Sequence, residues 1–547
     1  MPFFAQDSDM KRHFDTLDFL EKNILWLFAI AMLILFVRLG AAPVYILDEA
    51  KNAQCAREML EKGNLIVPLF NGELRTDKPA LHYWFMAFSY KMFGVGAWQA
   101  RLFSAIMGLI LIVATWGFTR KWMGDKFAAL TSALLIISIH LMFEFRLAVP
   151  DPYLITFTAL GLYSAYNYTQ LKSLKWLLFA SLFLALATLA KGPVALGLPG
   201  VALLIFIIST KAWWVLKDYR ILLAAALYGI IVVPWFWAVH IQTDGVFTNG
   251  FFFDHNLNRF SAEMEGHGGP FFLPLLFVIL GFLPFSLNMS GVVKSSGWRN
   301  GNPLLKFSII IALVYIVFFG FSRTKLPNYP MPSYPFVAII IAFVLFEYHR
   351  LNKKWPLYAL IILAVIAMAL PVGGYYALRM EPALKSVAAI AFGLSVLFFF
   401  MIPVFVFRQF KMQALLKWLI PAFLILNAYF LWIAYPAVYK RNPITNFQQQ
   451  HQIKDVLWLV YKQYNPALNF NAAAKGEYFT VSNRITDLEN VYKVATKDSL
   501  KKTILIISRR DHAEELLENG YEEIYAERDL FELPETVILK KRSFNKN

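Results

Sequence analysis

Long apolar runs recur along this chain from Asn23 to about Pro436, and they constrain its fold more than any other feature. Each run holds about 16 to 22 mostly apolar residues, the length at which a helix rising 1.5 Å per residue crosses a hydrocarbon layer of about 30 Å. Of the 547 residues, 58% are hydrophobic and only 16% are charged, too few for the polar surface of a soluble protein. The sequence therefore predicts a mainly α, polytopic membrane protein.

We count thirteen such runs, whose ends are fixed only to within several residues. They make up a predicted membrane domain, residues 1–438. The predicted spans are residues 24–40, 98–118, 127–145, 151–168, 176–190, 193–209, 221–240, 271–290, 305–321, 333–348, 357–376, 386–407 and 415–436.

The composition becomes polar after about Tyr439. Residues 503–507 and 536–539 are predicted strands, and residues 512–519 are a predicted helix that ends at Gly520. Residues 439–547 are therefore predicted to form a small soluble α/β domain.

The orientation follows from the short loops, because cytoplasmic loops carry an excess of Lys and Arg. Twenty such residues fall in the short loops on the side of the N-terminus, against six on the other side. This asymmetry predicts a cytoplasmic N-terminus, and thirteen spans then place the C-terminus outside. The formal charge of +16 is thus explained by topology and not by a nucleic-acid partner. Without a cleavage pattern before it, the first span is expected to remain as an anchor.

Two of the predicted outer loops are long, residues 41–97 and 241–270. In the first, the apolar stretches 65–70 and 81–93 are interrupted by breaks, which favours short helices lying along the membrane surface over a further span. We expect a shaped loop here and not a linker.

Ionisable residues that could carry chemistry lie in or beside the odd-numbered connections, which the charge count places outside. Exposing such side chains to lipid costs several kcal/mol, so they usually face a cavity or each other. A polar cavity near the outer leaflet is the simplest common destination. The candidates are Asp48, Glu49, Asp77, Lys78, Asp151, Lys191, His255, Arg259, Lys325 and Tyr329.

Each candidate in the first outer loop has a functional and a structural interpretation. Asp48 and Glu49 follow the first span, where a carboxylate accepts a proton from an acceptor or simply caps a helix. Lys78 pairs with a phosphate as a point charge, or with Asp77 at the surface.

The later candidates also have two interpretations. Asp151 stands between two prolines, where it needs no role beyond a helix N-cap. His255 and Arg259 share one face if their segment is helical, and they then clamp a phosphate or anchor an interfacial helix. Lys325 and Tyr329 combine a cation and a phenol at the end of a span, whereas Lys191 is best explained as the anchor of a turn.

Several common chemistries have no motif here. We find no glycine-rich phosphate loop and no Cys or His cluster with zinc-ligand spacing. Nucleotide sugars are not supplied outside the cell, whereas a lipid phosphate is presented by the bilayer itself. A lipid-linked donor therefore fits this side of the membrane better.

These residues, in this order, resemble a known family: the polyprenyl-phosphate-dependent glycosyltransferases of the aminoarabinose transferase and protein O-mannosyltransferase superfamily. The resemblance covers roughly residues 20–440. It is carried by Asp48-Glu49, Arg57 to Leu60, Ile66 to Pro68, Asp77-Lys78-Pro79, Tyr83-Trp84, Pro150-Asp151-Pro152, Ala190 to Pro193, His255 to Phe260 and Lys325 to Tyr329.

The resemblance implies the GT-C membrane fold and an inverting transfer from undecaprenyl phosphate or a similar carrier, on the periplasmic side of a bacterial inner membrane. Asp48 would be the carboxylate on the acceptor side, while Lys78 and Arg259 would stabilise the departing phosphate. Asp151 would be a second acidic site residue. The remaining implied substrate-binding residues are His255, Tyr329, Lys325, Asp77 and Tyr83.

The resemblance leaves several points open. The aminoarabinose branch tends to have Glu where this chain has Asp77, so neither the sugar nor a divalent metal ion is settled. The acceptor is a lipid, a glycan or a protein, and the C-terminal domain binds that acceptor or caps the cavity. A transporter of lipid-linked sugars is the competing prediction, but it would place ionisable groups near mid-membrane. A scaffold would give no reason for so many acids, bases and cations on one side.

Overall fold

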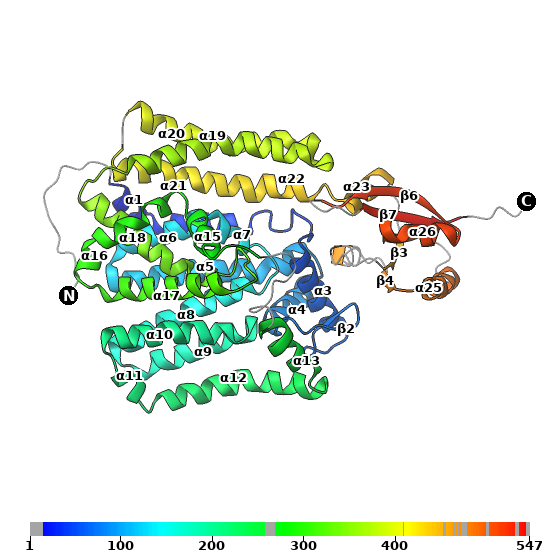
Figure 1. Cartoon of the computed structure of the whole chain (residues 1–547), viewed down its shortest axis with the longest axis horizontal. Helices are drawn as coiled ribbons and strands as arrows, with labels where there is room; N and C mark the ends of the chain where they lie inside the picture. The colour runs from blue at the N-terminus through cyan, green and yellow to red at the C-terminus, as the bar shows by residue number, and fades with distance from the viewer. Residues whose placement is uncertain are drawn as a thin grey trace, which may run out of the picture.

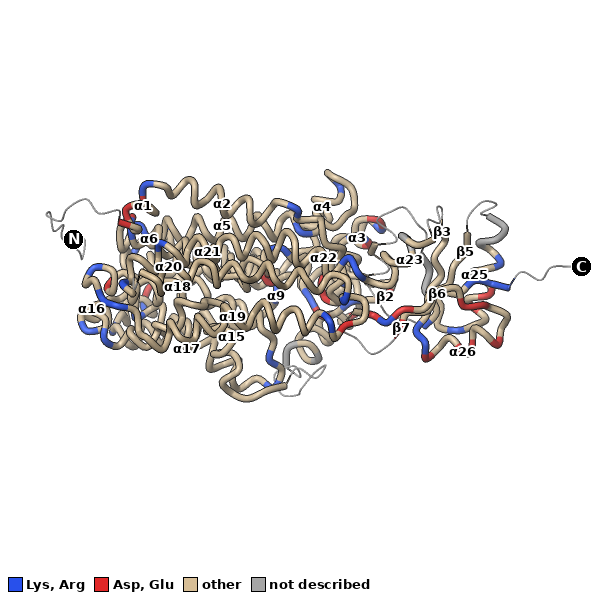
Figure 2. The backbone as a smooth tube through the Cα atoms, turned by 90° about the horizontal axis from the view of Figure 1, so that it is seen from above, with Lys and Arg blue, Asp and Glu red and all other residues tan. Residues whose placement is uncertain are grey.

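The computed structural model is an elongated bundle of helices with a small sheet at one end (Figure 1). Acidic and basic residues gather at the two ends of the bundle, and the stretch between them is largely uncharged (Figure 2). A bilayer imposes this layering, because charged side chains are stable only near its two faces. The structure describes residues 15–257, 268–407, 410–451, 456–462, 467, 470–471, 479–498, 503–530 and 535–542.

Within these described ranges, eight helices are long and apolar enough to cross a membrane, or ten if each of two bent pairs counts as one span. The polytopic helical fold is thus confirmed, whereas the count of thirteen spans is not. The eight are α5 (Ala97–Met123), α9 (Leu174–Lys191), α12 (Ile221–Gln242), α17 (Pro303–Phe321), η3 with α18 (Met331–Arg350), α19 (Leu357–Met380), η4 with α20 (Pro382–Val406) and α21 to α22 (Met412–Tyr439).

The two bent pairs are α1 (Thr16–Lys22) with α2 (Ile24–Phe36), and α15 (Leu273–Gly281) with η2 (Phe285–Lys294) and α16 (Ser296–Arg299). Their bends are 76° and 107°.

Three predicted spans are not among these helices, because each is too short, broken or too polar to be counted as a membrane helix. The span 127–145 is divided at Ser138 into α6 (Asp125–Ile137) and α7 (Ile139–Glu144), and α10 (Val194–Thr210) has only 17 residues. The span 151–168 is α8 (Asp151–Leu171), a helix buried among its neighbours. Because α8 faces protein and not lipid, it carries polar side chains that bond to other helices, such as Thr156 to the carbonyl of Met107 at 3.1 Å.

The first outer loop is structured, as expected, at the end of the bundle nearer the C-terminal sheet (Figure 1). It holds α3 (Leu47–Glu61) and α4 (Leu81–Phe93), and α4 is the short helix predicted at 81–93. The helix predicted at 65–70 is wrong: β1 (Leu69–Phe70) pairs with β2 (Glu73–Leu74) in a hairpin.

The hairpin forms because Asn71 and Gly72 tolerate the positive φ angles, 55° and 80°, that a two-residue turn requires. The carboxylate of Glu58 then accepts hydrogen bonds from both of their backbone amides, at 2.8 and 2.9 Å.

The second outer loop begins with α13 (Val246–Asn249) and η1 (Gly250–Leu257), so His255 lies on a π-helical turn. Arg259 lies outside the described residues. On the opposite side of the bundle, α11 (Trp214–Lys217) precedes α12.

The C-terminal part is a five-stranded sheet in the order β4-β3-β5-β7-β6, as the predicted α/β composition requires. Strands β3, β4 and β5 are parallel, whereas β7 is antiparallel to both β5 and β6. The predicted strands are β5 and β7, and the predicted helix is α26, which ends before Gly520 at φ 82°. The elements are α23 (Pro443–His451), β3 (Val456–Tyr461), β4 (Phe479–Ser482), α25 (Ile485–Asp498), β5 (Thr503–Arg509), α26 (Arg510–Glu518), β6 (Tyr521–Arg528) and β7 (Glu535–Lys541).

Candidate functional site

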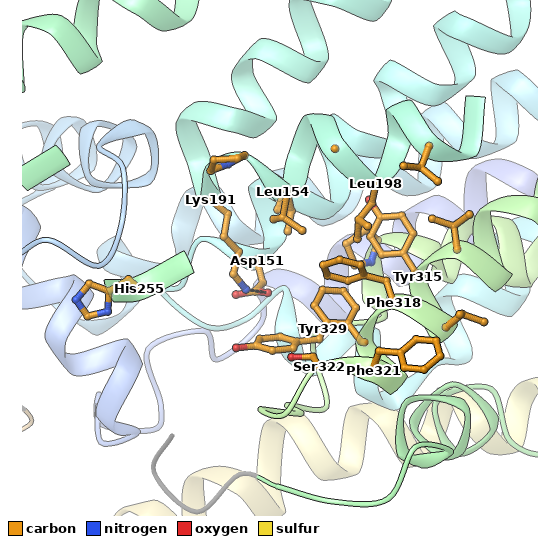
Figure 3. Close-up of a pocket in the computed structure, with 18 of the residues that line it drawn as sticks. Asp151, Leu154, Lys191, Leu198, His255, Tyr315, Phe318, Phe321, Ser322 and Tyr329 are labelled. Carbon is orange, nitrogen blue, oxygen red and sulfur yellow. Dashed lines mark hydrogen bonds and ion pairs between the residues drawn. The ribbon is translucent and has the colours of Figure 1, made fainter. Parts of the chain in front are cut away.

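A cavity of about 980 Å³ opens between α10 and α17 near the end of the bundle that carries α3 and α4. Figure 3 shows that its polar and apolar side chains are segregated, with His255, Asp151 and Lys191 toward one side and Phe318 and Phe321 toward the other. Its polar lining consists of Asp77, Lys78, Asp151, Lys191, His255, Ser322 and Tyr329.

The apolar part of the cavity is a trough between two helices. Residues of α10 spaced three or four apart line one wall and those of α17 line the other, as expected when one face of each helix is used. From Val194 to Ile205 the α10 wall is about 16 Å long at 1.5 Å per residue. The trough residues are Val194, Gly197, Leu198, Val201, Ile205, Leu313, Val314, Val317, Phe318 and Phe321.

Two helix ends place a buried ion pair at the junction of the polar and apolar parts. Asp151 begins α8 and Lys191 ends α9, and Lys191 Nζ lies 2.5 Å from Asp151 Oδ1. The ammonium also lies 5.4 Å from the centre of the Tyr329 ring. The sequence favours a turn anchor for Lys191, but the structure places its charged group in the cavity.

Glycine is required directly after Lys191. Gly192 has a φ of 92°, and a Cβ there would lie 2.5 Å from the Phe251 ring of η1. This close approach brings η1, and with it His255, against the end of α9.

Asp77 and Lys78 enter the cavity from the first outer loop. The neighbouring Arg75 keeps the Asp77 carboxyl ionised. Arg75 Nε and Nη2 donate to the Asp77 carboxylate at 2.6 and 2.9 Å. Burial acts to raise the pKa of Asp77, but Arg75 and then Lys78 hold it well below its usual range, with a further contribution from His255. Asp77 is therefore an anion at neutral pH and is engaged by cations.

Four candidates do not line this cavity. Lys325 is buried and donates to the carbonyl of Ser322 at 2.5 Å, so it caps the end of α17. Tyr83 is fully buried, and its hydroxyl donates to Asn52 at 3.4 Å. Asp48 is an exposed carboxylate in the first turn of α3, within electrostatic range of Glu144.

Glu49, the fourth, takes a different position from the adjacent Asp48. Its side chain is fully buried against Arg101, with bonds of 2.6 and 2.8 Å to Nε and Nη2. It also accepts the backbone amide of Ala148 at 2.9 Å. This placement favours the structural interpretation of Glu49 over the catalytic role that the sequence offered for it as a proton acceptor.

The sequence did not single out Arg75, Arg101 or Glu144. Glu144 is buried at the end of α7, in electrostatic contact with Asp151 and Lys191. The sequence does contain a signal for Glu144: a carboxylate at the end of an apolar run seldom faces lipid, so it is expected to face a polar site. Arg101 lies inside a predicted span and had the same signal.

The structure also bears on the metal ion that the sequence left open. In the part of the chain that the structure describes, no group of three or more His, Cys, Asp and Glu side chains is placed to hold a metal. Asp77 and His255 are near each other, but they are only two such groups.

Comparison with known proteins relates this chain to a family. Residues 25–245 match the model of the dolichyl-phosphate-mannose-protein mannosyltransferase family. An uncharacterized protein of Aquifex aeolicus is 30% identical over 335 residues, which cover 60% of this chain and 73% of that protein.

A second relative has a named activity. The undecaprenyl phosphate-alpha-4-amino-4-deoxy-L-arabinose arabinosyl transferase of Shewanella sediminis is 30% identical over 318 residues. The match covers 56% of each chain, so this chain spans only about half the length of that transferase.

The fold has a solved counterpart. The crystal structure of ArnT from Cupriavidus metallidurans bound to undecaprenyl phosphate superposes with a TM-score of 0.73 at 22% identity, covering 94% of this chain and 97% of that one. At this identity the likeness shows a shared fold, which is the GT-C architecture that the family resemblance implies.

Proposed function

Because this chain belongs to the family of polyprenyl-phosphate-dependent membrane glycosyltransferases of the aminoarabinose transferase and protein mannosyltransferase type, we propose that it transfers a sugar from a polyprenyl-phosphate carrier to an acceptor. The carrier is undecaprenyl phosphate or a close relative, as the named relatives suggest. The acceptor is a lipid, a glycan or a protein. The membrane is the bacterial inner membrane, with the N-terminus in the cytoplasm and the cavity and C-terminal domain in the periplasm.

The cavity's division into a charged end and an apolar trough carries this proposal. A polyprenyl phosphate has the same division, an anionic head group joined to a hydrocarbon chain. Lys78 and Lys191 supply positive charge at one end, and the walls of α10 and α17 supply an apolar surface about 16 Å long. A free sugar phosphate would leave that trough empty, and a lipid without an anionic head group would make no use of the two lysines at the charged end.

The reaction is a single displacement at the anomeric carbon. An acceptor oxygen or nitrogen forms the new bond to that carbon as the bond to the phosphate oxygen breaks, and the electron pair leaves with polyprenyl phosphate. Lys78, aided by Arg259, stabilises the charge that develops on the departing phosphate. Asp48 takes the proton of the acceptor. Asp151 is engaged by Lys191 and serves to fix that cation and the donor sugar.

Transfer from a radiolabelled polyprenyl-phosphate sugar, with a membrane extract as acceptor, tests the function. We expect purified protein to move label into a new product, and the Lys78→Met variant to do so about 10²-fold or more slowly, because it lacks a cation at the leaving group. Lys62→Met, an exposed lysine of the same loop, is the control and should keep the wild-type rate. Label that crosses reconstituted vesicles without entering a product would instead indicate a transporter.

A glycine in the trough allows the lipid-binding part of the proposal to be tested separately. Gly197 lines the cavity, and a Cβ built there meets nothing within 4 Å, so Gly197→Leu should fold and fill part of the trough. We expect KM for a long-chain donor to rise about 10-fold, since about 1.4 kcal/mol of lost binding has that effect.

Gly200→Leu is the matched control for this change. It makes the same replacement on the same helix, also with nothing within 4 Å of the new Cβ, but Gly200 does not line the cavity. Equal KM values for the two variants would contradict binding of the prenyl chain between α10 and α17.

A further inference from the structure

The loop that leads from the first membrane helix to Asp48 is held from two sides. On the membrane side, Arg101 Nη1 donates to the carbonyls of Leu39 and Ala42 at 3.0 and 2.8 Å, and Nη2 donates to that of Pro43 at 3.3 Å. The same guanidinium binds Glu49, the residue after Asp48. One buried cation thus ties both ends of residues 39–49 together.

The second set of contacts comes from the C-terminal domain. Asn471 Nδ2 donates to the carbonyl of Val44 at 2.8 Å, across 427 positions of the chain. The backbone amide of Leu530 donates to the hydroxyl of Tyr45 at 3.2 Å. The Tyr45 ring also lies 5.9 Å from that of Tyr439, at the end of the last membrane helix. Figure 1 places α3 at the end of the bundle beside this domain, consistent with these bonds.

These contacts lie within a few residues of the reacting group. Val44 and Tyr45 precede Asp48 by four and three positions, and α3 begins at Leu47. Any shift of the loop therefore moves the first turn of α3, and the Asp48 carboxylate with it. A misplacement of about 1 Å in a reacting group costs up to about 10²-fold in rate.

We propose that the C-terminal domain is a positioning element of the transfer site, which holds the 44–47 loop through Asn471 and Leu530 and so sets the position of Asp48. The role of Asp48 in this proposal rests on the proposed function. Neither Asn471 nor Leu530 contacts substrate, and both act through the loop. The domain is therefore part of the working enzyme and not only a cover over the cavity.

The domain makes another contact that provides a matched control. Arg528 pairs with Glu381, in the turn between α19 and η4, and this contact does not involve the 44–47 loop. Arg528→Ala weakens the attachment of the domain to the membrane part but leaves the bonds to Val44 and Tyr45 in place.

The test measures backbone hydrogen exchange of residues 41–50 and, separately, transfer kinetics, both on the full-length chain. We expect Asn471→Ala to speed exchange in this peptide and to lower kcat about 10-fold with an unchanged KM for the donor. Asn471→Gln keeps the amide donor and should restore part of kcat. Arg528→Ala should match the wild type in both measurements. If Asn471→Ala does not fold, Tyr45→Phe removes the oxygen that receives the Leu530 amide and keeps the ring.

The proposal would be overturned if hydrogen exchange of residues 41–50 were no faster in Asn471→Ala than in the wild type. It would also be overturned if exchange rose as much in Arg528→Ala as in Asn471→Ala. Faster exchange with an unchanged kcat would also overturn it, because the loop would then not position Asp48. If no variant and no wild-type protein transfers sugar, the proposed function fails, while the exchange measurement still decides whether the domain holds the loop.

Discussion

Replacing Asp48 by asparagine should lower kcat for transfer by about 10² to 10⁴, the range that a positioned general base contributes. The asparagine amide has nearly the same shape as the carboxylate, but it does not accept the proton that the acceptor loses. Because Asp48 does not line the cavity that receives the donor, KM for the donor should change little. The measurement is initial-rate kinetics with donor varied at saturating acceptor.

The structure distinguishes Asp48 from the other carboxylates at this end of the bundle. Glu49 is fully buried in its pair with Arg101, and Asp151 is bound by Lys191 at 2.5 Å, so each is already engaged by a cation. Asp48 is exposed in the first turn of α3, where the partial positive charge of a helix N-terminus stabilises a carboxylate. Among the residues that the structure describes, Asp48 forms no salt bridge, so an acceptor arriving from the aqueous side reaches it without displacing a described cation.

Glu73→Gln is the control for this prediction, since it neutralises an exposed carboxylate in the same outer loop. It should transfer sugar at the wild-type rate. If Asp48→Asn retains full kcat while Lys78→Met does not, the donor site stands and the base must be sought elsewhere, with Glu144 as the next carboxylate to replace.

The membrane fold was predictable because lipid imposes a simple rule on composition. Apolar runs of spanning length and the distribution of Lys and Arg require no tertiary information. The rule fails where a helix is surrounded by protein, as α8 is, because its polar side chains then find partners inside the bundle. The polytopic fold is therefore confirmed, whereas the count of thirteen spans is not.

The site was predictable only in part, because the cavity depends on which helix ends meet. The sequence indicated that Asp77, Lys78, Asp151, His255 and Tyr329 share one side of the membrane, and the structure places all five on one cavity. It gave no means to distinguish Asp48 from Glu49, which are adjacent in the chain but face different surroundings. The hairpin at Asn71-Gly72 has a local sequence signal, the Asn-Gly pair, but the apolar content of residues 65–70 favours a helix instead.

Arg101 shows what sequence patterns do not reveal. It lies in the apolar run of α5 and is 1% exposed, yet its guanidinium bonds to three backbone carbonyls and to the Glu49 carboxylate. The three carbonyls belong to residues that follow the end of α2, where backbone acceptors have no partners within the helix. The Arg101 guanidinium thus donates hydrogen bonds to the carbonyls of this segment and also neutralises the buried Glu49 carboxylate.

Replacing Arg101 by methionine should therefore lower the free energy of unfolding by about 3–5 kcal/mol, because it leaves the Glu49 carboxylate buried without its cation. Arg120→Met is the matched control: the Arg120–Asp125 pair has the same charges, but its side chains are 52% and 43% exposed, so about 0–1 kcal/mol should be lost. Thermal denaturation of the detergent-solubilised chains compares the two. The double variant Arg101→Met with Glu49→Leu should recover part of the loss, since it removes the unpaired charge as well. A similar denaturation temperature for Arg101→Met and Arg120→Met would mean that the loop before Asp48 does not depend on this ion pair.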